Sequence, residues 1–277
     1  MSKVIWLASY PKSGNTWLRL LLASCLNGGR PVDINAIPVG SGLAFDRAAF
    51  DERLGVAAAD LADDDVLALK AEALRAEVAD IAPPLFLKTH DARLLLPGGD
   101  WTVPPDITRG AIYLIRDPRD VAPSLARHLG YDLDRAIDFM ARPARMAQTR
   151  RALPPQLPQL WSDWSGNVES WLTAAPFPAF VVRYEQLRAA PEETLAEILG
   201  ALGLSQPRQV VRDAVAATAL DKLRAQEAAA GFSEAHRSPS FFGAGRVGGW
   251  KELLNAEQAA RIEADHGAMM RRLGYLT

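Results

Sequence analysis

The chain has 277 residues, 49% of them hydrophobic, and is long enough for one large α/β domain, which we expect to span residues 1–277. Its formal net charge of −2 provides no broad basic field, so we expect neither nucleic acid nor a membrane as a partner. The single cysteine, Cys25, excludes an intrachain disulfide and, with an N-terminus that lacks a signal-peptide core, predicts a cytoplasmic protein.

The first expected element is a short buried strand, which leads through a polar loop into a helix over residues 17–26. The loop reads Tyr-Pro-Lys-Ser-Gly-Asn-Thr-Trp over residues 10–17. The first backbone N–H groups of the helix that follows have no hydrogen-bond partner within the helix, and the helix dipole favours negative charge at the same end. Lys12 adds a positive charge, and Ser13 and Thr16 add hydroxyl donors. The loop therefore predicts a phosphate or sulfate site.

Further along the chain, apolar runs alternate with helical patterns. Strands are expected at residues 85–90, 111–115 and 179–184, and helices at residues 46–54, 65–81, 121–129, 132–150, 191–202, 207–219 and 255–272. Residues 91–108 and 230–249 are expected to be loops. Strands that alternate with helices predict an α/β fold, with a central, mostly parallel sheet flanked by helices.

Polar side chains stand at the C-terminal end of the second expected strand, where Lys88, Thr89 and His90 follow an apolar run. In open parallel sheets, ligands bind just outside these strand ends. Because an imidazole titrates near neutral pH, His90 is a candidate general base.

The loop over residues 10–17 resembles the 5′-phosphosulfate loop of the sulfotransferases that use PAPS, 3′-phosphoadenosine 5′-phosphosulfate. The family's usual sequence at this loop is Tyr-Pro-Lys-Ser-Gly-Thr-Thr-Trp, and only Asn15 differs from it. The triphosphate loop of ATP-binding proteins fits less well, because Lys12 precedes Gly14 and no glycine stands upstream. The resemblance implies a P-loop-like three-layer fold and PAPS as co-substrate. It implies the following contacts with PAPS: Lys12, Ser13, Gly14, Asn15 and Thr16 at the 5′ end, and Trp17 stacked on the adenine.

A second motif covers residues 114–124, which read Leu-Ile-Arg-Asp-Pro-Arg-Asp-Val-Ala-Pro-Ser. It is similar to the family's 3′-phosphate motif, with Arg116 and Ser124 in the matching places. If the two converge, a guanidinium and a hydroxyl would bind one phosphate. Pro123 is expected in the first turn of the following helix, where proline is tolerated.

The resemblance also assigns residues from the C-terminal half. Tyr184 matches the family's adenine-pocket tyrosine, and Thr218 matches the threonine of the family's Thr-Ser-Phe segment. Residues 242–251 are similar to the segment that closes over the 3′-phosphate, within a mobile lid loop expected at about residues 225–249. Gly245 fits this segment.

Two cations of that C-terminal segment are missing, because Gly243 and Ala244 occupy the positions of the family's basic pair. A glycine-rich loop is pliable and arginine is long, so Arg246 is one candidate to replace them and Arg237 is a second, and the choice between the two stays open.

The resemblance also implies roles in catalysis, since residues 88–90 match the family's Lys-Thr-His. His90 would be the general base, while Lys12 would neutralise the leaving phosphate and Lys88 the sulfuryl oxygens. No metal is expected. The acceptor is expected to be a small molecule with a hydroxyl or amine group, in a pocket shaped by residues 32–84 and 130–165. Its identity and the oligomeric state stay open.

Two other functions stay open. An apolar strand that ends at Asp117 also resembles the Mg²⁺-binding strand of ATPases, which would make the protein an ATP-dependent kinase. The missing basic pair at Gly243 and Ala244 would suit a nucleotide-binding module with impaired catalysis.

Overall fold

The computed structural model describes residues 2–40, 46–143, 145–146, 156–173, 176–235, 241–243 and 245–277. The chain forms two compact units. The first consists of Met1–Tyr10, Gly40–Tyr113 and Arg142–Ala179, and the second of Pro11–Val39, Leu114–Ala141 and Phe180–Thr277. The boundary between Tyr10 and Pro11 falls inside the loop for which the sequence predicts an anion.

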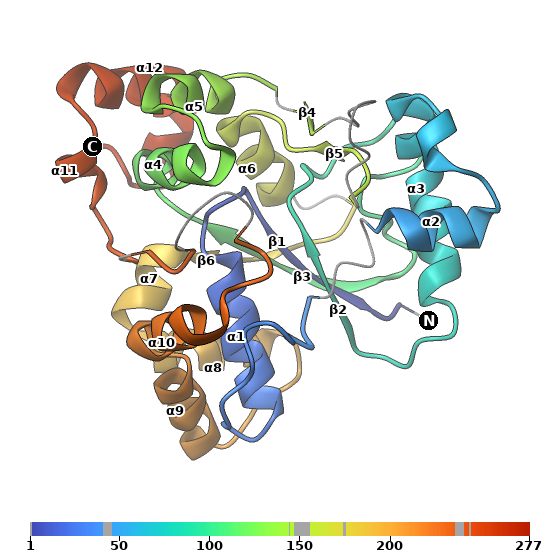
Figure 1. Ribbon diagram of the computed structural model, residues 1–277, viewed down its shortest axis with the longest axis horizontal. Helices are drawn as coiled ribbons and strands as arrows, with labels where there is room; N and C mark the ends of the chain where they lie inside the picture. The colour runs from blue at the N-terminus through green and yellow to red at the C-terminus, as the bar shows by residue number, and fades with distance from the viewer. Residues whose placement is uncertain are drawn as a thin grey trace. The chain divides into compact units, whose positions relative to one another are not determined.

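Within the described residues, the larger sheet has four strands in the order β2-β1-β3-β6 (Figure 1). These strands are β1 (Val4–Ser9), β2 (Leu85–Thr89), β3 (Thr108–Ile115) and β6 (Phe180–Arg183). β1 is buried along its whole length and runs parallel to β2, with Ala8 opposite Thr89. β3 continues from the first unit into the second. The mostly parallel sheet with flanking helices confirms the predicted α/β class.

The rest of the first unit consists of short helices and one small antiparallel strand pair. Its elements are α2 (Arg47–Leu54), η2 (Ala58–Asp60), α3 (Asp63–Val78), β4 (Arg145–Met146), β5 (Gln159–Leu160) and α6 (Trp164–Leu172). Asp46 caps α2 by accepting a hydrogen bond from the backbone N–H of Ala49. α2 packs on α3 through an apolar cluster that includes Phe50, Val66 and Leu157.

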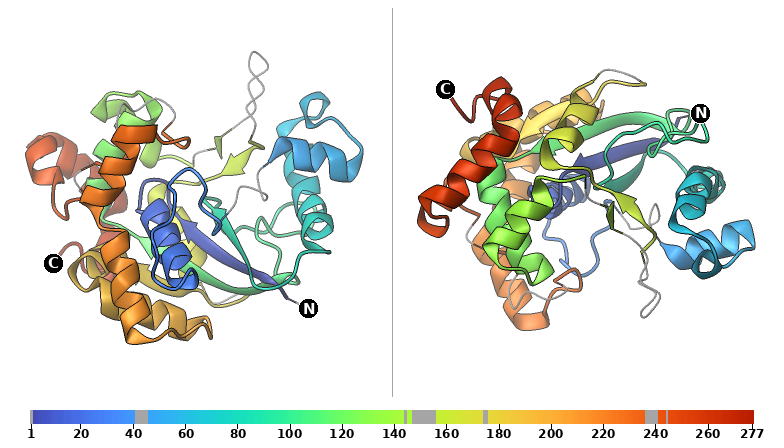
Figure 2. Two further views of the ribbon diagram at one scale, coloured as in Figure 1. Left: turned by 60° about the horizontal axis from the view of Figure 1, so that its bottom comes forward. Right: turned by 90° about the horizontal axis from the view of Figure 1, so that it is seen from above.

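Helices make up most of the second unit. They are α1 (Asn15–Leu26), α4 (Pro118–Leu129), α5 (Leu133–Met140), α7 (Tyr184–Ala189), α8 (Pro191–Ala201), α9 (Arg208–Ala217), α10 (Leu220–Ala230), α11 (Trp250–Leu253) and α12 (Ala256–Arg272). α1 packs against α9, and α12 packs against α4 and α5, as Figures 1 and 2 show.

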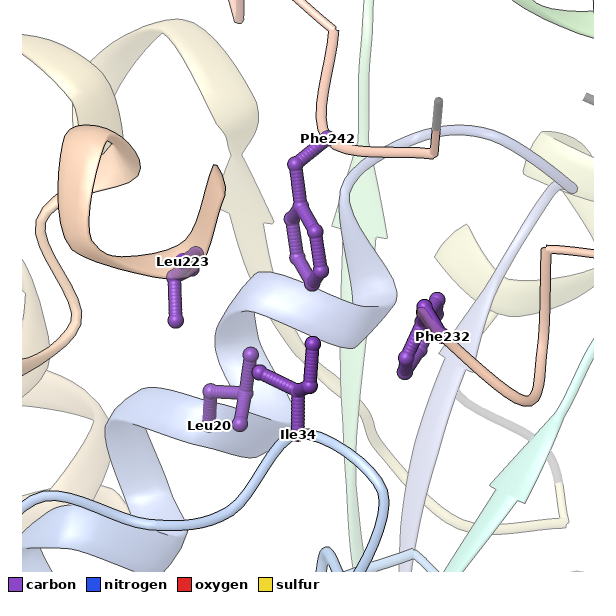
Figure 3. Packing of buried hydrophobic residues seen from close by; sticks show 5 residues of the cluster. All are labelled: Leu20, Ile34, Leu223, Phe232 and Phe242. Carbon is purple, nitrogen blue, oxygen red and sulfur yellow. The ribbon is translucent and has the colours of Figure 1, made fainter. Parts of the chain in front are cut away.

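A cluster of five buried side chains fixes part of the C-terminal region on α1. Leu20 of α1 and Leu223 of α10 lie in it together with Ile34, Phe232 and Phe242 (Figure 3). Burial of apolar side chains of this size contributes about 1.5–3 kcal/mol each. The cluster therefore holds Phe242, and with it the start of the glycine-rich segment, close to the first helix.

Two of the predicted helices whose bounds differ in the structure have a proline inside their expected range. The helix expected at residues 132–150 ends at Met140, and residues 145–146 form a strand. Pro143 explains this, because it lacks an N–H group and disfavours helical backbone at the residue before it. α4 begins at Pro118 because Asp117 accepts a hydrogen bond from the Arg119 N–H as its N-cap. Pro123 consequently lies inside the helix, so the prediction that it lies in the first turn was wrong.

The expected lid loop at residues 225–249 also starts later than predicted, because residues 220–230 form α10. Its residues are good helix formers, but only Leu223 is buried, so the helix gives little hydrophobic periodicity. Over the described parts of the chain, no helix is long and apolar enough to cross a bilayer.

Candidate active site

The loop between β1 and α1 has the backbone geometry of an anion site. Lys12 and Gly14 have left-handed backbone conformations, with φ of 67° and 102°. Gly14 is the N-cap of α1, and neither a capping side chain nor an acidic residue in the first turn satisfies the helix N-terminus. The first N–H groups of a helix have no partner within it, and its dipole attracts negative charge. The N-terminus of α1 is therefore suited to a phosphate or sulfate.

Ser13 is fully buried, and its hydroxyl has no hydrogen-bond partner within the described structure. Leaving a buried polar group unsatisfied costs about 1–3 kcal/mol, so such a group in a folded protein needs an explanation. An anion bound in the loop would accept this hydrogen bond. Asn15 and Thr16 are also buried, at 4% and 7% exposure. The side chains that the sequence assigns to the 5′ end of the donor thus fit an oxyanion.

Gly14 is required by a neighbour far away in the sequence. A Cβ atom at this position would lie 2.6 Å from Cδ2 of Tyr184, and the φ of 102° disfavours any other residue. The Tyr184 hydroxyl in turn donates a hydrogen bond of 3.1 Å to the carbonyl of Gly245. The structure therefore brings together three residues that the sequence predicted for one site.

Trp17 and Thr218, both predicted near the adenine, are joined by a hydrogen bond of 3.1 Å from the indole Nε1 to the Thr218 carbonyl. The Trp17 ring meets Tyr184 edge to face, with ring centroids 6.1 Å apart. The Thr218 hydroxyl donates to the Ala214 carbonyl at 2.8 Å. The backbone carbonyl of Thr218 thus positions the Trp17 indole. The Thr218 side chain hydrogen-bonds to the last turn of α9, where Thr218 is the C-cap.

Arg116 is a cation without a carboxylate partner among the described residues. It donates to two backbone carbonyls, those of Lys12 at 3.3 Å and Arg246 at 3.1 Å, and its buried Nε has no partner. Its guanidinium also lies 4.4 Å from the centre of the Tyr184 ring. Ser124 lies half-buried on α4, and no hydrogen bond joins it to Arg116 within the described structure. Arg116 is well placed to bind an anion beside the loop.

Arg246 and Arg237 are the two residues that the sequence suggests as replacement cations, and the structure describes only Arg246. The guanidinium of Arg246 donates to both carboxylate oxygens of Glu252, at 3.0 and 2.8 Å, and its side chain is 61% exposed. Arg237, like Ala244, lies outside the described residues. Lys12 lies with its Nζ 3.9 Å from the centre of the Phe241 ring.

In the first unit, His90 follows β2 and lies beside the end of β1. Its Nδ1 is 2.8 Å from the carbonyl oxygen of Ser9, and this oxygen can only accept a hydrogen bond. Nδ1 therefore carries the proton of the neutral ring, and Nε2 carries the lone pair. Lys88 is half-buried two residues earlier, opposite Leu7 in the parallel register. His90 thus has the tautomer in which Nε2 can accept a proton.

A family model described as "Sulfotransferase domain" matches residues 2–274 of the chain. This chain belongs to the sulfotransferase family. The match confirms the family and the enzyme class that the sequence predicted, PAPS-dependent sulfotransferases.

Solved structures of mouse sulfotransferase SULT7A1 and of retinol dehydratase share the fold. A crystal structure of mouse sulfotransferase SULT7A1 complexed with PAP superposes with a TM-score of 0.62 at 16% identity, covering 98% of this chain and 84% of that one. Retinol dehydratase in complex with androsterone and inactive cofactor PAP gives 0.60 at 18% identity, covering 96% and 80%. Retinol dehydratase with retinol and PAP gives 0.61 at 18%, covering 98% and 82%. At these identities the likeness shows the fold, which is the predicted P-loop-like α/β fold.

The kinase alternative depends on Asp117, whose carboxylate is hydrogen-bonded to Arg119 in the structure. Its carboxylate accepts hydrogen bonds from the backbone N–H of Arg119 at 2.9 Å and from the guanidinium of the same residue at 2.8 Å. Within the described ranges, no group of three or more His, Cys, Asp or Glu side chains could hold a metal ion. Asp117 therefore serves as a helix cap and an ion-pair partner.

Asp120 is a residue of the site that the sequence did not reveal. Its carboxylate accepts hydrogen bonds from the backbone N–H groups of Gly248 at 2.7 Å and Trp250 at 2.9 Å. Arg119 covers the face of the Trp250 indole at 4.3 Å. α4 thereby fixes the glycine-rich segment, which the sequence could show only as a loop.

The sequence also gave no indication of Asn167 in the first unit, which hydrogen-bonds to the backbone carbonyl of His90. It is fully buried and donates to the carbonyls of His90 at 3.0 Å and Trp161 at 2.8 Å, while it accepts a hydrogen bond from the Tyr113 hydroxyl at 2.6 Å. No local pattern marks this residue, because its partners lie as far as 77 residues away.

The residue after His90 is anchored by a buried ion pair. Asp91 pairs with Lys70 at 2.7 Å, and both side chains are almost fully buried. The second oxygen of Asp91 accepts a hydrogen bond of 2.6 Å from the Leu160 N–H. Removing one partner of a buried ion pair costs about 3–5 kcal/mol. The end of β2 is therefore rigidly held.

Proposed function

We propose that this sulfotransferase transfers a sulfuryl group from PAPS to a hydroxyl or amine of a small molecule. When bound, PAPS supplies an activated sulfuryl group, and the 3′,5′-bisphosphate PAP is released. The observation that supports this donor best is the buried, unpartnered hydroxyl of Ser13 at the N-terminus of α1. Solved structures of the same fold, mouse sulfotransferase SULT7A1 and retinol dehydratase, contain PAP.

The loop residues would bind the 5′ end of the donor. Ser13, Asn15 and Thr16 donate hydrogen bonds, together with the first backbone N–H groups of α1. Gly14 keeps the loop close enough to Tyr184 for this geometry. Lys12 places its charge on the 5′-phosphate, which gains negative charge as the sulfuryl group leaves.

The rest of the nucleotide would be held by other residues of the second unit. Arg116 and Ser124 bind the 3′-phosphate, and an arginine that lacks a carboxylate partner is suited to this. Trp17 and Tyr184 offer aromatic faces to the adenine. Gly245 provides the carbonyl that orients Tyr184.

His90 would act as general base in the transfer. Its Nε2 accepts the proton from the acceptor hydroxyl as the new S–O bond forms, and the Ser9 carbonyl stabilises the resulting imidazolium through Nδ1–H. Lys88, two residues earlier, balances the charge on the sulfuryl oxygens. Asn167 and Asp91 keep the backbone at His90 in place.

For the acceptor, we propose a lipophilic small molecule, which residues 32–84 and 130–165 would bind. Two solved structures of the same fold, both of retinol dehydratase, contain androsterone and retinol, which are small lipophilic alcohols. We also propose that residues 1–277 form a single sulfotransferase domain and that the enzyme works in the cytoplasm, where Cys25 would stay reduced.

A transfer assay tests this function. The purified chain is incubated with ³⁵S-labelled PAPS and a panel of alcohols, phenols, glycosides and amines, and labelled products are separated from the donor. We expect label on at least one lipophilic alcohol or phenol. Calorimetric binding of PAP without transfer to any acceptor would instead indicate the impaired nucleotide-binding module, and the absence of both binding and transfer would contradict the proposal.

A further inference from the structure

Positions 243 and 244 lack the basic pair that the family resemblance predicts for the 3′-phosphate. We propose that Arg127 of α4 supplies a replacement cation from another element and helps to bind the 3′-phosphate of the donor. This inference rests on the proposed function, and it identifies a binding residue that none of the family motifs in the sequence includes.

The first argument is the place of Arg127 in space. A Cβ atom added to Gly243 would lie 3.6 Å from Nη2 of Arg127, so the guanidinium lies beside the point where a side chain from position 243 would begin. On α4, Arg127 follows Ser124 by three residues, and residues at this spacing lie on one helix face with their Cβ atoms about 5–6 Å apart. A phosphate bound by Ser124 is therefore within reach of this long side chain.

The second argument is electrostatic. Loss of hydration and, as the smaller cause, repulsion by the positive charge of Arg116 lower the pKa of Arg127. Neither arginine has a carboxylate partner among the residues that the structure describes. Two like charges held together without a counter-ion are unfavourable, and a phosphate dianion would relieve this. Although Arg127 loses part of its hydration, its surface is still exposed to solvent, so an incoming phosphate can reach it.

The third argument is that the segment opposite Arg127 is held in place. The Glu227 carboxylate of α10 accepts hydrogen bonds from the backbone N–H groups of Phe241 and Phe242. Arg224 of the same helix donates to the carbonyls of Phe242 and Gly243, at 3.0 and 2.5 Å. Phe242 is also buried in the cluster of Figure 3. The position of this segment near α4 is therefore determined by several contacts.

Arg246 is the competing candidate. Its charge is neutralised by Glu252, in a pair whose side chains are 61% and 70% exposed. An exposed pair of this kind contributes only about 0–1 kcal/mol, so Arg246 can leave it. The experiment must therefore compare the two arginines directly.

Calorimetry with two nucleotides separates them, because PAP carries a 3′-phosphate and adenosine 5′-monophosphate does not. Both are titrated into the wild type and into Arg127→Gln, Arg246→Gln and Arg135→Gln. Arg135 is an exposed arginine on α5 that contacts the Tyr131 ring, and it serves as the matched control for loss of charge. Arg127→Gln should weaken PAP binding about 10-fold or more, as expected for loss of a charge-assisted hydrogen bond, and leave AMP binding unchanged. Arg135→Gln should change neither.

A rescue variant strengthens the test. Gly243 has no positive φ and would accept a side chain, so Gly243→Arg added to Arg127→Gln should restore the preference for PAP. An unchanged ratio of PAP to AMP affinity in Arg127→Gln, with or without a lower melting temperature, overturns the inference, as does a loss that Arg246→Gln alone produces. If the wild type binds PAP more tightly than AMP but Arg127→Gln keeps the same ratio, only the role of Arg127 is contradicted. If the wild type itself does not prefer PAP over AMP, the proposed function is contradicted as well.

Discussion

At the scale of single residues, the proposed role of His90 as general base depends on which ring nitrogen carries a proton. The sequence places this histidine at a strand end, but not its tautomer, because the Ser9 carbonyl that fixes it lies 81 residues away. With Nδ1 donating to that carbonyl, only Nε2 can take a proton from an acceptor. The Ser9 carbonyl thus sets the tautomer that the proposed mechanism requires.

Replacing His90 with alanine should therefore abolish transfer but not donor binding. Loss of a general base reduces turnover by about 10²–10⁴-fold. PAP affinity, measured by calorimetry, should stay within about 2-fold of the wild type because the nucleotide residues are unchanged. Turnover at the wild-type rate would remove His90 from the mechanism, and a parallel loss of PAP affinity would make its role structural.

Gly14 gives a second prediction at this scale. An alanine there would take up a strained φ of 102° and place its Cβ 2.6 Å from the Tyr184 ring, so the loop must move and PAP binding should fall at least 10-fold. Gly28→Ala is the matched control, because Gly28 has a φ of 69° and no atom within 4 Å of the added Cβ. It should cost only the backbone strain, about 1–2 kcal/mol of stability. Equal PAP affinity in the two variants would show that Tyr184 does not constrain the loop.

At the scale of elements, the sequence predicted best where local signals decide the structure. The strand from Val4, the loop and α1 follow from apolar patterning and glycine placement. α10 was missed because it buries little, and Pro123 was misplaced because the Asp117 cap starts α4 earlier than its apolar residues suggest. The contacts of Arg127, Asp120 and Asn167 could not be predicted, since each depends on segments brought together only by folding.

The anchoring of the glycine-rich segment by α4 gives a prediction for Asp120. Asp120→Ala removes the acceptor for two backbone N–H groups, at Gly248 and Trp250, and the segment should become less ordered. Because a loop that must be ordered on binding weakens affinity, PAP binding should fall about 10-fold. Asp134→Ala, which removes an exposed ion pair with Arg261 and a 3.3 Å hydrogen bond from the Gln258 side chain, should leave the affinity unchanged. Identical affinities in both variants would show that the anchor does not serve the nucleotide.

At the scale of the whole molecule, the family could be predicted because its motifs are spread from the first strand to α11. The nucleotide residues fall in the second unit, and His90 and Lys88 fall in the first. The acceptor could not be predicted, since the segments assigned to its pocket match no motif. Specificity of this kind depends on the shape that side chains from several segments form together.

Metal dependence is a property of the whole enzyme and separates sulfuryl transfer from the kinase alternative. The charged side chains of lysine and arginine can stabilise the transferred group without a metal ion, and Arg119 forms an ion pair with the Asp117 carboxylate. Turnover with PAPS should therefore be unchanged by EDTA, and phosphate transfer from ATP should not occur with or without Mg²⁺. Turnover that disappears with EDTA and returns with Mg²⁺ would contradict this account.

The most direct test of the account is a crystal structure with PAP bound. The 5′-phosphate should lie at the N-terminus of α1, within hydrogen-bond distance of the Ser13 hydroxyl and the first backbone N–H groups of that helix, with the 3′-phosphate at Arg116. Density for PAP at any other place, with Ser13 still lacking a partner, would contradict it.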